Sequence, residues 1–245
     1  MTAVPASSSP TAERPEPLSP TERTRVNRGR HRALGDRADL LALLEDALVA
    51  HLGVVVGDHP LVLPTAFAFD VDGPDDGGTL YVHGSVAAAW LRASVGSTVC
   101  VTITELDGLV TARSAFSHSM NYRSAVVIGS ARLVEDPDER RHALDLIVDQ
   151  MVPGRSATLR PSTRKELAAT AVLAVPLREA SMKQRAGGPG DEPADVAARV
   201  WGGHVPVRRV LDDPVPADDN LPGLAVPDDV ADVADAAAQT KQVSG

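Results

Sequence analysis

The order of apolar and polar residues predicts a chain of short β-strands with a few helices. A helical pattern begins at Asp36, a residue type suited to the N-cap position. Apolar residues then recur every three or four positions and would share one face of a helix of about thirteen residues. They are Leu40, Leu41, Leu44, Ala47 and Leu48.

β-branched runs separated by turn residues make up most of the remaining chain. Turns are predicted at residues 57–60 and at Asp107-Gly108, and Gly129 predicts a bulge or a barrel corner within the longest run. The predicted strands are 51–56, 61–67, 79–83, 98–104, 109–113, 124–134, 171–177, 181–185 and 205–210. Six to eight short strands with peripheral helices indicate a closed or partly closed antiparallel barrel.

Further helices are predicted between these strands. Ser85 is expected to cap a short helix over residues 86–95, which would end at Gly96. Asp136 and Pro137 begin a well-specified helix that ends near Met151. A shorter helix is expected near residues 163–170.

The ends of the chain differ in composition from its middle. Residues 1–20 are rich in Ser, Pro and Ala, and residues 212–245 in Asp, Pro and Ala, apart from a weak helical pattern over 229–239. Such segments bury too little apolar surface to offset the entropy of ordering. We therefore predict one domain over residues 21–211, with a disordered tail at 1–20 and a mostly disordered tail at 212–245.

Charge and cysteine content narrow the range of partners and compartments. The formal net charge of -9 disfavours nucleic acid and anionic membranes as partners. The single cysteine, Cys100, lies in an apolar run, which predicts an inert buried thiol and a reducing environment. No run approaches the roughly 20 apolar residues of a membrane span, and no export signal is visible. The sequence predicts a soluble, cytoplasmic protein.

Residues 113–124 concentrate polar side chains between apolar strands. Two Arg, four Ser, a His, an Asn and a Tyr lie within this segment, and each would need a partner in a dry core. A ligand pocket or a subunit interface would accommodate them. The chain carries no P-loop, G-x-S-x-G, paired CxxC or H-E-x-x-H motif, so the classes of enzyme defined by those motifs are disfavoured.

The segment 107–124 (DGLVTARSAFSHSMNYRS) resembles the signature of the pyridoxamine 5'-phosphate oxidase-like, flavin-nucleotide-binding family that includes nitroimidazole-resistance proteins. The resemblance covers roughly residues 23–210. It implies an FMN-binding split β-barrel, mainly β with peripheral helices, that forms a homodimer with FMN in the groove between the subunits. Further matching segments are 60–65 (PLVLPT), 80–85 (LYVHGS), 153–155 (PGR), 181–185 (SMKQR) and 201–203 (WGG).

The resemblance implies roles for several residues. Pro64 and Thr65 would lie along the flavin ring. His83, Gly84 and Ser85 would hold the phosphate, where a helix N-terminus favours an anion; a strand-end histidine bonded to nearby backbone is the alternative for His83. The groove would be lined by Arg113, Ser114, His118, Tyr122 and Arg123, for which an interface network between two barrels is the structural alternative.

One position departs from the family pattern. Relatives often carry Ser or Gly and then Arg or Lys after the His-Gly-Ser turn, whereas this chain has Ala88 and Ala89 before Trp90. Losing such a charge-assisted contact costs about 1.5 to 3 kcal/mol, or one to two decades of affinity. Arg92, Arg113 or Arg123 are the candidate substitutes, and adaptation of the groove to another ligand is the alternative.

Three functions remain open from the sequence. The leading hypothesis is an FMN-dependent oxidoreductase acting on a small molecule, with His118 as the candidate proton donor to a reduced substrate. The second is haem binding, with His83 or His118 as the axial ligand of the iron; otherwise no metal site is predicted. The third is a cofactor carrier without turnover, because fold alone does not establish chemistry.

Overall fold

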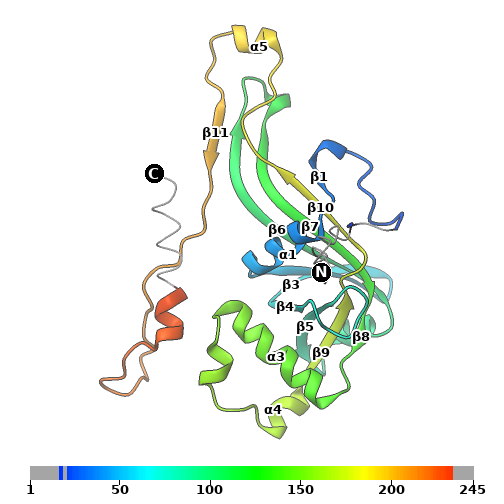
Figure 1. Cartoon of the computed structure of the whole chain (residues 1–245), viewed down its shortest axis with the longest axis vertical. Helices are drawn as coiled ribbons and strands as arrows, with labels where there is room; N and C mark the ends of the chain where they lie inside the picture. Colours follow the sequence, from blue (N-terminus) through cyan, green and yellow to red (C-terminus); the bar gives the residue numbers. More distant parts are fainter. Residues whose placement is uncertain (1–16, 19–20, 234–245) are drawn as a thin grey trace, which may run out of the picture.

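The structure, a computed structural model, describes residues 17–18 and 21–233. Figure 1 shows two long curved strands rising from a barrel, with helices at the opposite end. The prediction for residues 1–20 falls largely outside the described residues, as does the end of the predicted C-terminal tail. The division into one domain and two tails stays a prediction.

The larger of the two sheets is antiparallel and follows the order β1-β10-β7-β6-β2-β3, with β11 paired to the second half of β6. Its members are β1 (Ala33–Leu34), β2 (Ala50–Val56), β3 (His59–Thr65), β6 (Thr98–Thr111), β7 (Ser119–Ser130), β10 (Ala180–Arg185) and β11 (Gly203–Pro206). The predicted hairpin at residues 57–60 is confirmed, but its turn is only two residues long, since Val56 pairs directly with His59.

The smaller sheet, also antiparallel, follows the order β4-β5-β9-β8. Its members are β4 (Phe67–Asp70), β5 (Thr79–Ser85), β8 (Arg132–Leu133) and β9 (Thr170–Pro176). One core forms between the two sheets and α1, and includes Leu40, Leu52 and Ile103. A second cluster, with Tyr81, Ile147 and Val172, lies between the smaller sheet and α3. The predicted fold, mainly β with peripheral helices, is confirmed.

The helices begin where their capping residues predict. Asp36 accepts a hydrogen bond from the Ala38 amide, Asp136 accepts from the amides of Asp138 and Glu139, and Thr163 forms a capping box with Glu166. These side chains satisfy amides that have no partner within their helix. The helices are α1 (Arg37–Asp46), α2 (Ala89–Ser94), α3 (Pro137–Met151), α4 (Arg164–Ala169) and α5 (Pro193–Ala197).

The predicted turn at Asp107-Gly108 is wrong. β6 runs through it as one strand, and the pairing with β7 shifts register between Leu106 and Gly108, which is a β-bulge. The strand continues because both of its edges are paired there, to β7 on one side and to β11 on the other. A Cβ on Gly108 would lie 3.0 Å from the Val205 carbonyl oxygen, so this bulge requires a small residue.

The helix predicted over residues 86–95 is also wrong in its first half. Ser85 is the last residue of β5, and its hydroxyl accepts from the Ala87 amide in a local turn. α2 starts only at Ala89, with no side-chain cap at Ala88. The backbone of Ser85 pairs with β9, which holds it in the extended conformation.

The predicted strands near Gly129 and residues 205–210 also differ from the observed ones. β7 continues through Gly129 and stops at Ser130, and Ala131 separates it from β8. The glycine allows a close approach, because an added Cβ would lie 2.9 Å from Val175 Cγ1. β11 spans only Gly203–Pro206 because its pairing with β6 ends at Gly108, where the bulge lies.

Beyond β11 the chain runs along one side of the molecule towards α3 (Figure 1). A helical turn begins at Asp228, and Asp229 accepts a hydrogen bond from Arg155 at 3.2 Å. This contact ties the segment to the end of the smaller-sheet layer. Within residues 17–18 and 21–233, no helix is long and apolar enough to cross a membrane.

Candidate functional site

The polar run predicted to form a site lies at the far end of the long β6–β7 hairpin. Residues 112–118 form the connection, which contains a short 3-10 helix, Ala115–Ser117. Ser114 caps this helix, because its hydroxyl accepts from the Ser117 amide at 3.3 Å. The connection therefore has a defined backbone that holds its side chains in place.

His118 is oriented by a hydrogen bond within this connection. Its Nδ1 lies 2.8 Å from the carbonyl oxygen of Ser114. A carbonyl oxygen only accepts, so Nδ1 carries the hydrogen and Nε2 of the neutral ring keeps its lone pair. The side chain is exposed. This is the arrangement that orients many metal-binding and catalytic histidines.

His118 lines a hollow of about 540 Å³, which we call the His118 pocket. The surrounding chain comes from the basic segment before β1, from the hairpin connection, and from the loop after β10. The lining residues are His31, Arg32, Phe116, Ser117, His118, Ser119, Gln184, Arg185, Ala186, Gly188, Pro189 and Gly190. Two arginines and two histidines are among them, and in the described part of the chain no Asp or Glu lines this pocket.

The two arginines of the His118 pocket keep their charge without a carboxylate. Arg185 donates to the Asn121 side-chain oxygen and to the carbonyl oxygens of Gly187 and Gly188, which are all neutral acceptors. Arg32 forms no ion pair with any described residue. Because uncompensated guanidinium groups attract anions, this pocket suits a carboxylate or phosphate ligand.

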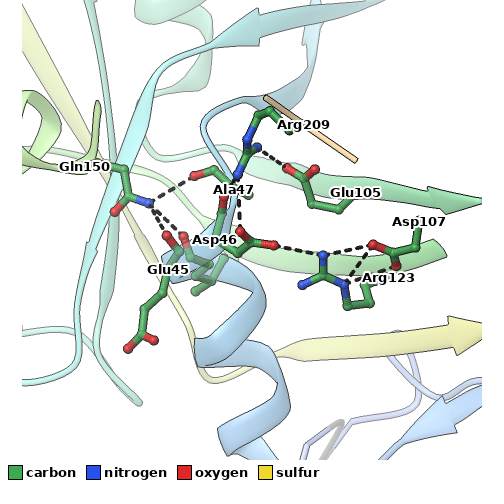
Figure 2. A network of polar contacts seen from close by, with 9 residues as sticks. Glu45, Asp46, Ala47, Glu105, Asp107, Arg123, Gln150 and Arg209 are labelled. Atoms are coloured by element: carbon green, nitrogen blue, oxygen red, sulfur yellow. Dashed lines mark hydrogen bonds and ion pairs between the residues drawn. The ribbon is translucent and has the colours of Figure 1, made fainter. Parts of the chain in front are cut away.

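Arg123 lies in a different hollow, of about 730 Å³, which we call the Asp46 pocket. Figure 2 shows its polar network: Arg123 donates to Asp107 and Asp46, and Arg209 donates to Asp46 and Glu105. The Asp107 carboxylate, and then Asp46, raise the pKa of the Arg123 guanidinium. Both arginines are already neutralised, so neither offers a free cation to a phosphate.

Arg113 is committed to an ion pair on another side of the hairpin. Its Nη1 lies 2.8 Å from Asp191 Oδ2, and its Nε donates to the Val200 carbonyl oxygen at 3.0 Å. The Asp191 side chain is only 1% exposed, so the pair is largely shielded from water. Arg113 fastens the loop around α5 to the hairpin and does not face the His118 pocket.

His83 lies on β5, half-buried, opposite Val172 on β9. Burial lowers the pKa of its imidazole, so the neutral ring is favoured. Its Nδ1 is buried and has no hydrogen-bond partner among the described residues. The alternative of a histidine bonded through Nδ1 to nearby backbone is therefore wrong, and the orphaned nitrogen needs a partner from outside the described chain.

Gly84 and Ser85 continue β5 beside α2. A Cβ on Gly84 would lie 2.6 Å from Trp90 Cζ2, so the glycine lets the indole pack directly on the strand. α2 is six residues long and lacks a side-chain cap, so the predicted phosphate site at its N-terminus has no structural support. The position of the family cation is occupied by small residues, Ala88 and Ala89.

Arg92 is the candidate substitute whose charge is free. Its Nη1 donates to the carbonyl oxygens of Ala87, at 2.7 Å, and Val86, which places the guanidinium against the segment that follows Ser85. No carboxylate in the described residues pairs with it. Of the three arginines considered as substitutes, Arg113 and Arg123 are neutralised by aspartates, and Arg92 is bound only by neutral backbone.

The remaining predicted residues lie on the barrel away from both pockets. Pro64 is exposed on β3 opposite His51, and the Thr65 hydroxyl donates to the Ala66 carbonyl oxygen at 3.0 Å. Tyr122 pairs with Leu106 and Arg185 across the larger sheet. Within one chain the predicted residues therefore fall into separate regions.

Sequence reasoning missed the part of the His118 pocket formed by Arg32 and the loop after β10. The available signal was the excess of cations in residues 23–32 of an otherwise acidic chain. Only the pairing of β1 with β10 reveals the connection, since it brings Leu34 beside Met182.

An antiparallel split barrel with a histidine-bearing hairpin pocket defines a cofactor-binding class of protein. Residues 36–184 match the pyridoxamine 5'-phosphate oxidase family. The chain belongs to this family. A comparison with curated proteins finds no match.

Solved structures extend the likeness beyond the family segment. The flavocytochrome Anf3 from Azotobacter vinelandii is 36% identical, with a TM-score of 0.80 over 87% of this chain and 97% of that one. The FAD and haem binding protein from Mycobacterium smegmatis is 38% identical, with a TM-score of 0.75 over 81% and 95%.

A more distant structure shows the fold alone. It is described as a 5-nitroimidazole antibiotic resistance protein from Bacteroides thetaiotaomicron and is 24% identical, with a TM-score of 0.51 over 62% of this chain and 85% of that one.

Proposed function

We propose that this protein is a redox protein that binds a flavin and also haem, and that it acts as a flavin-dependent oxidoreductase on a small molecule. One observation carries the proposal: two proteins named for a flavin, a haem or both are 36% and 38% identical to this chain and are covered almost completely by it. The free histidine nitrogens support it from the structure.

The flavin part rests on β3, β5 and the start of α2. Pro64 and Thr65 would present backbone to the ring, and His83 would contribute the buried nitrogen that has no partner. Arg92 would supply the phosphate-binding charge that Ala88 and Ala89 lack. When bound, a flavin supplies the hydride and electron chemistry, and the protein orients it and excludes water.

FAD and FMN share the ring and the first phosphate, so both fit these contacts. The FMN predicted from the family resemblance and the FAD in the name of the M. smegmatis relative are separated by extracting the bound flavin and measuring its mass.

The haem part was tested against the donors that the chain offers. An axial ligand needs a neutral imidazole with a free nitrogen. His118 fits because its Nδ1–H is bound to the Ser114 carbonyl and its Nε2 is unassigned. His83 is neutral but its buried Nδ1 lacks the acceptor that commonly orients an axial histidine. A haem ligand at His118 excludes the predicted role of the same nitrogen as proton donor.

A homodimer would complete the flavin groove. Val55 on β2 and Val62 on β3 point outward from the larger sheet and are 64% and 63% exposed. Exposed apolar strand positions of this kind are commonly covered by another subunit. A second barrel over this face would shield Pro64 and place its own residues beside the flavin.

The ultraviolet-visible spectrum of cleanly purified protein tests the proposal. We expect flavin absorption near one flavin per chain, and a Soret band after addition of haemin and removal of the unbound part. Flavin without a Soret band would limit the function to a flavoprotein. Retention of neither chromophore would overturn the proposal and favour a different ligand in an adapted groove.

A further inference from the structure

We propose that the His118 pocket is the haem site of this chain, with Nε2 of His118 as an axial ligand and with Arg32 and Arg185 receiving the haem propionates. This inference rests on the haem part of the proposed function. It adds what the relatives' names do not state, namely which pocket, which nitrogen and which cations take part.

The ligand nitrogen is the first argument. The Ser114 carbonyl fixes both the tautomer and the ring orientation of His118, with 2.8 Å between the two atoms. That leaves Nε2 as the donor atom at the wall of a hollow of about 540 Å³, within the usual range for cofactor pockets. No conformational change is needed to expose the lone pair.

The charge of the lining is the second argument. Haem carries two propionate groups, and planar guanidinium groups bind carboxylates through paired hydrogen bonds. Arg185 is held in position by the neutral oxygens of Asn121 and Gly188, so its positive charge remains available. Arg32 has no carboxylate partner in the described chain. The protein as a whole is acidic, so this cationic lining is local.

The apolar contact is the third argument. Phe116 lines the same pocket and is 100% exposed, so no part of the chain packs on its ring. An exposed aromatic next to a free histidine nitrogen suits the flat apolar surface of a porphyrin. Gly188 and Gly190 leave open space beside it, since a Cβ on either glycine would meet no atom within 4 Å.

The experiment is a haemin titration of the full-length protein, followed by the Soret band and by electron paramagnetic resonance of the ferric iron. We expect saturable binding near one haem per chain. The His118→Ala variant should lose the histidine-ligated spectrum, whereas His83→Ala should keep it. His118 is exposed, so its variant should unfold at the same temperature as the wild type, which circular dichroism verifies.

A second arm isolates the propionate contacts. Haemin dimethyl ester carries no propionate charge. Arg32→Gln should weaken haemin binding about 10-fold, the size of one charge-assisted contact, and should leave binding of the dimethyl ester unchanged. Arg164→Gln, on the exposed start of α4, is the matched control and should change neither.

Each contrary outcome has a separate meaning. Loss of the histidine-ligated spectrum in His83→Ala but not in His118→Ala would overturn the site and leave the proposed function standing. Equal effects of Arg32→Gln on both haems would overturn the propionate contact. A wild-type protein that binds flavin but no haemin would contradict the haem part of the proposed function itself. Displacement of haemin by adenosine monophosphate would assign the pocket to a nucleotide instead.

Discussion

Asp46, the last residue of α1, accepts a hydrogen bond from Arg123 on β7, with 2.8 Å between Oδ2 and Nη2 (Figure 2). The other carboxylate oxygen of Asp46 accepts from Arg209, on the segment after β11, at 3.2 Å. A single side chain thus joins α1, the larger sheet and the C-terminal segment along one wall of the Asp46 pocket.

Replacing Asp46 with Ala should therefore destabilise the fold. Two guanidinium groups lose a carboxylate, but each keeps another one, and Asp46 is 46% exposed. We expect the free energy of unfolding to fall by about 1 kcal/mol, as for a partly solvated ion pair. Denaturant unfolding measures it. Asp145→Ala, on the exposed middle of α3, is the control and should leave stability unchanged or slightly raised. Equal losses in both variants would contradict the coupling.

Gly129 is required by the close approach of β7 to β9. In Gly129→Ala the added Cβ would lie 2.9 Å from Val175 Cγ1 and 3.1 Å from Pro176 Cδ, so the core must shift. We expect a loss of about 1 to 3 kcal/mol in the free energy of unfolding, the usual cost of overpacking. Gly35→Ala is the control, because nothing lies within 4 Å of its Cβ position. A fully stable Gly129→Ala protein would show that the strands separate easily.

Burial of His83 should make the stability of the ligand-free protein depend on pH. Its folded-state pKa lies below the ordinary value, so as pH falls through about 6.5 the unfolded chain binds a proton first. Stability should therefore decrease from pH 7.5 to pH 5.5. His83→Gln removes this contribution, so its stability should fall less over the same interval. Parallel curves for the two proteins in denaturant unfolding would contradict the prediction.

Arg92 should contribute to flavin affinity. Arg92→Gln removes the only cation against the segment after Ser85 that has no carboxylate partner in the described residues. We expect about 10-fold weaker binding of flavin nucleotide and unchanged binding of riboflavin, which lacks the phosphate. Fluorescence quenching measures both. Arg92→Lys should restore part of the affinity, and equal weakening for riboflavin would point to a structural role.

Local sequence signals determined much of the fold. The caps at Asp36, Asp136 and Thr163 fixed where helices begin, because each side chain bonds to amides only two or three residues away. Alternating β-branched residues located most strands. The prediction failed at Asp107-Gly108 and at Ser85, where pairing with distant strands outweighed turn and capping preferences that are equally local.

The candidate site depended on tertiary structure. The sequence singled out His118 and the polar run around it, since those residues are adjacent in the chain. Only the folded protein joined His118 to Arg32 and Arg185, which lie 86 and 67 positions away along the chain. It also separated Arg113 and Arg123 from that pocket, because each is bound to an aspartate elsewhere. A residue type states which chemistry is available, whereas the available charge and the free nitrogen follow from which partners the fold brings within hydrogen-bond distance.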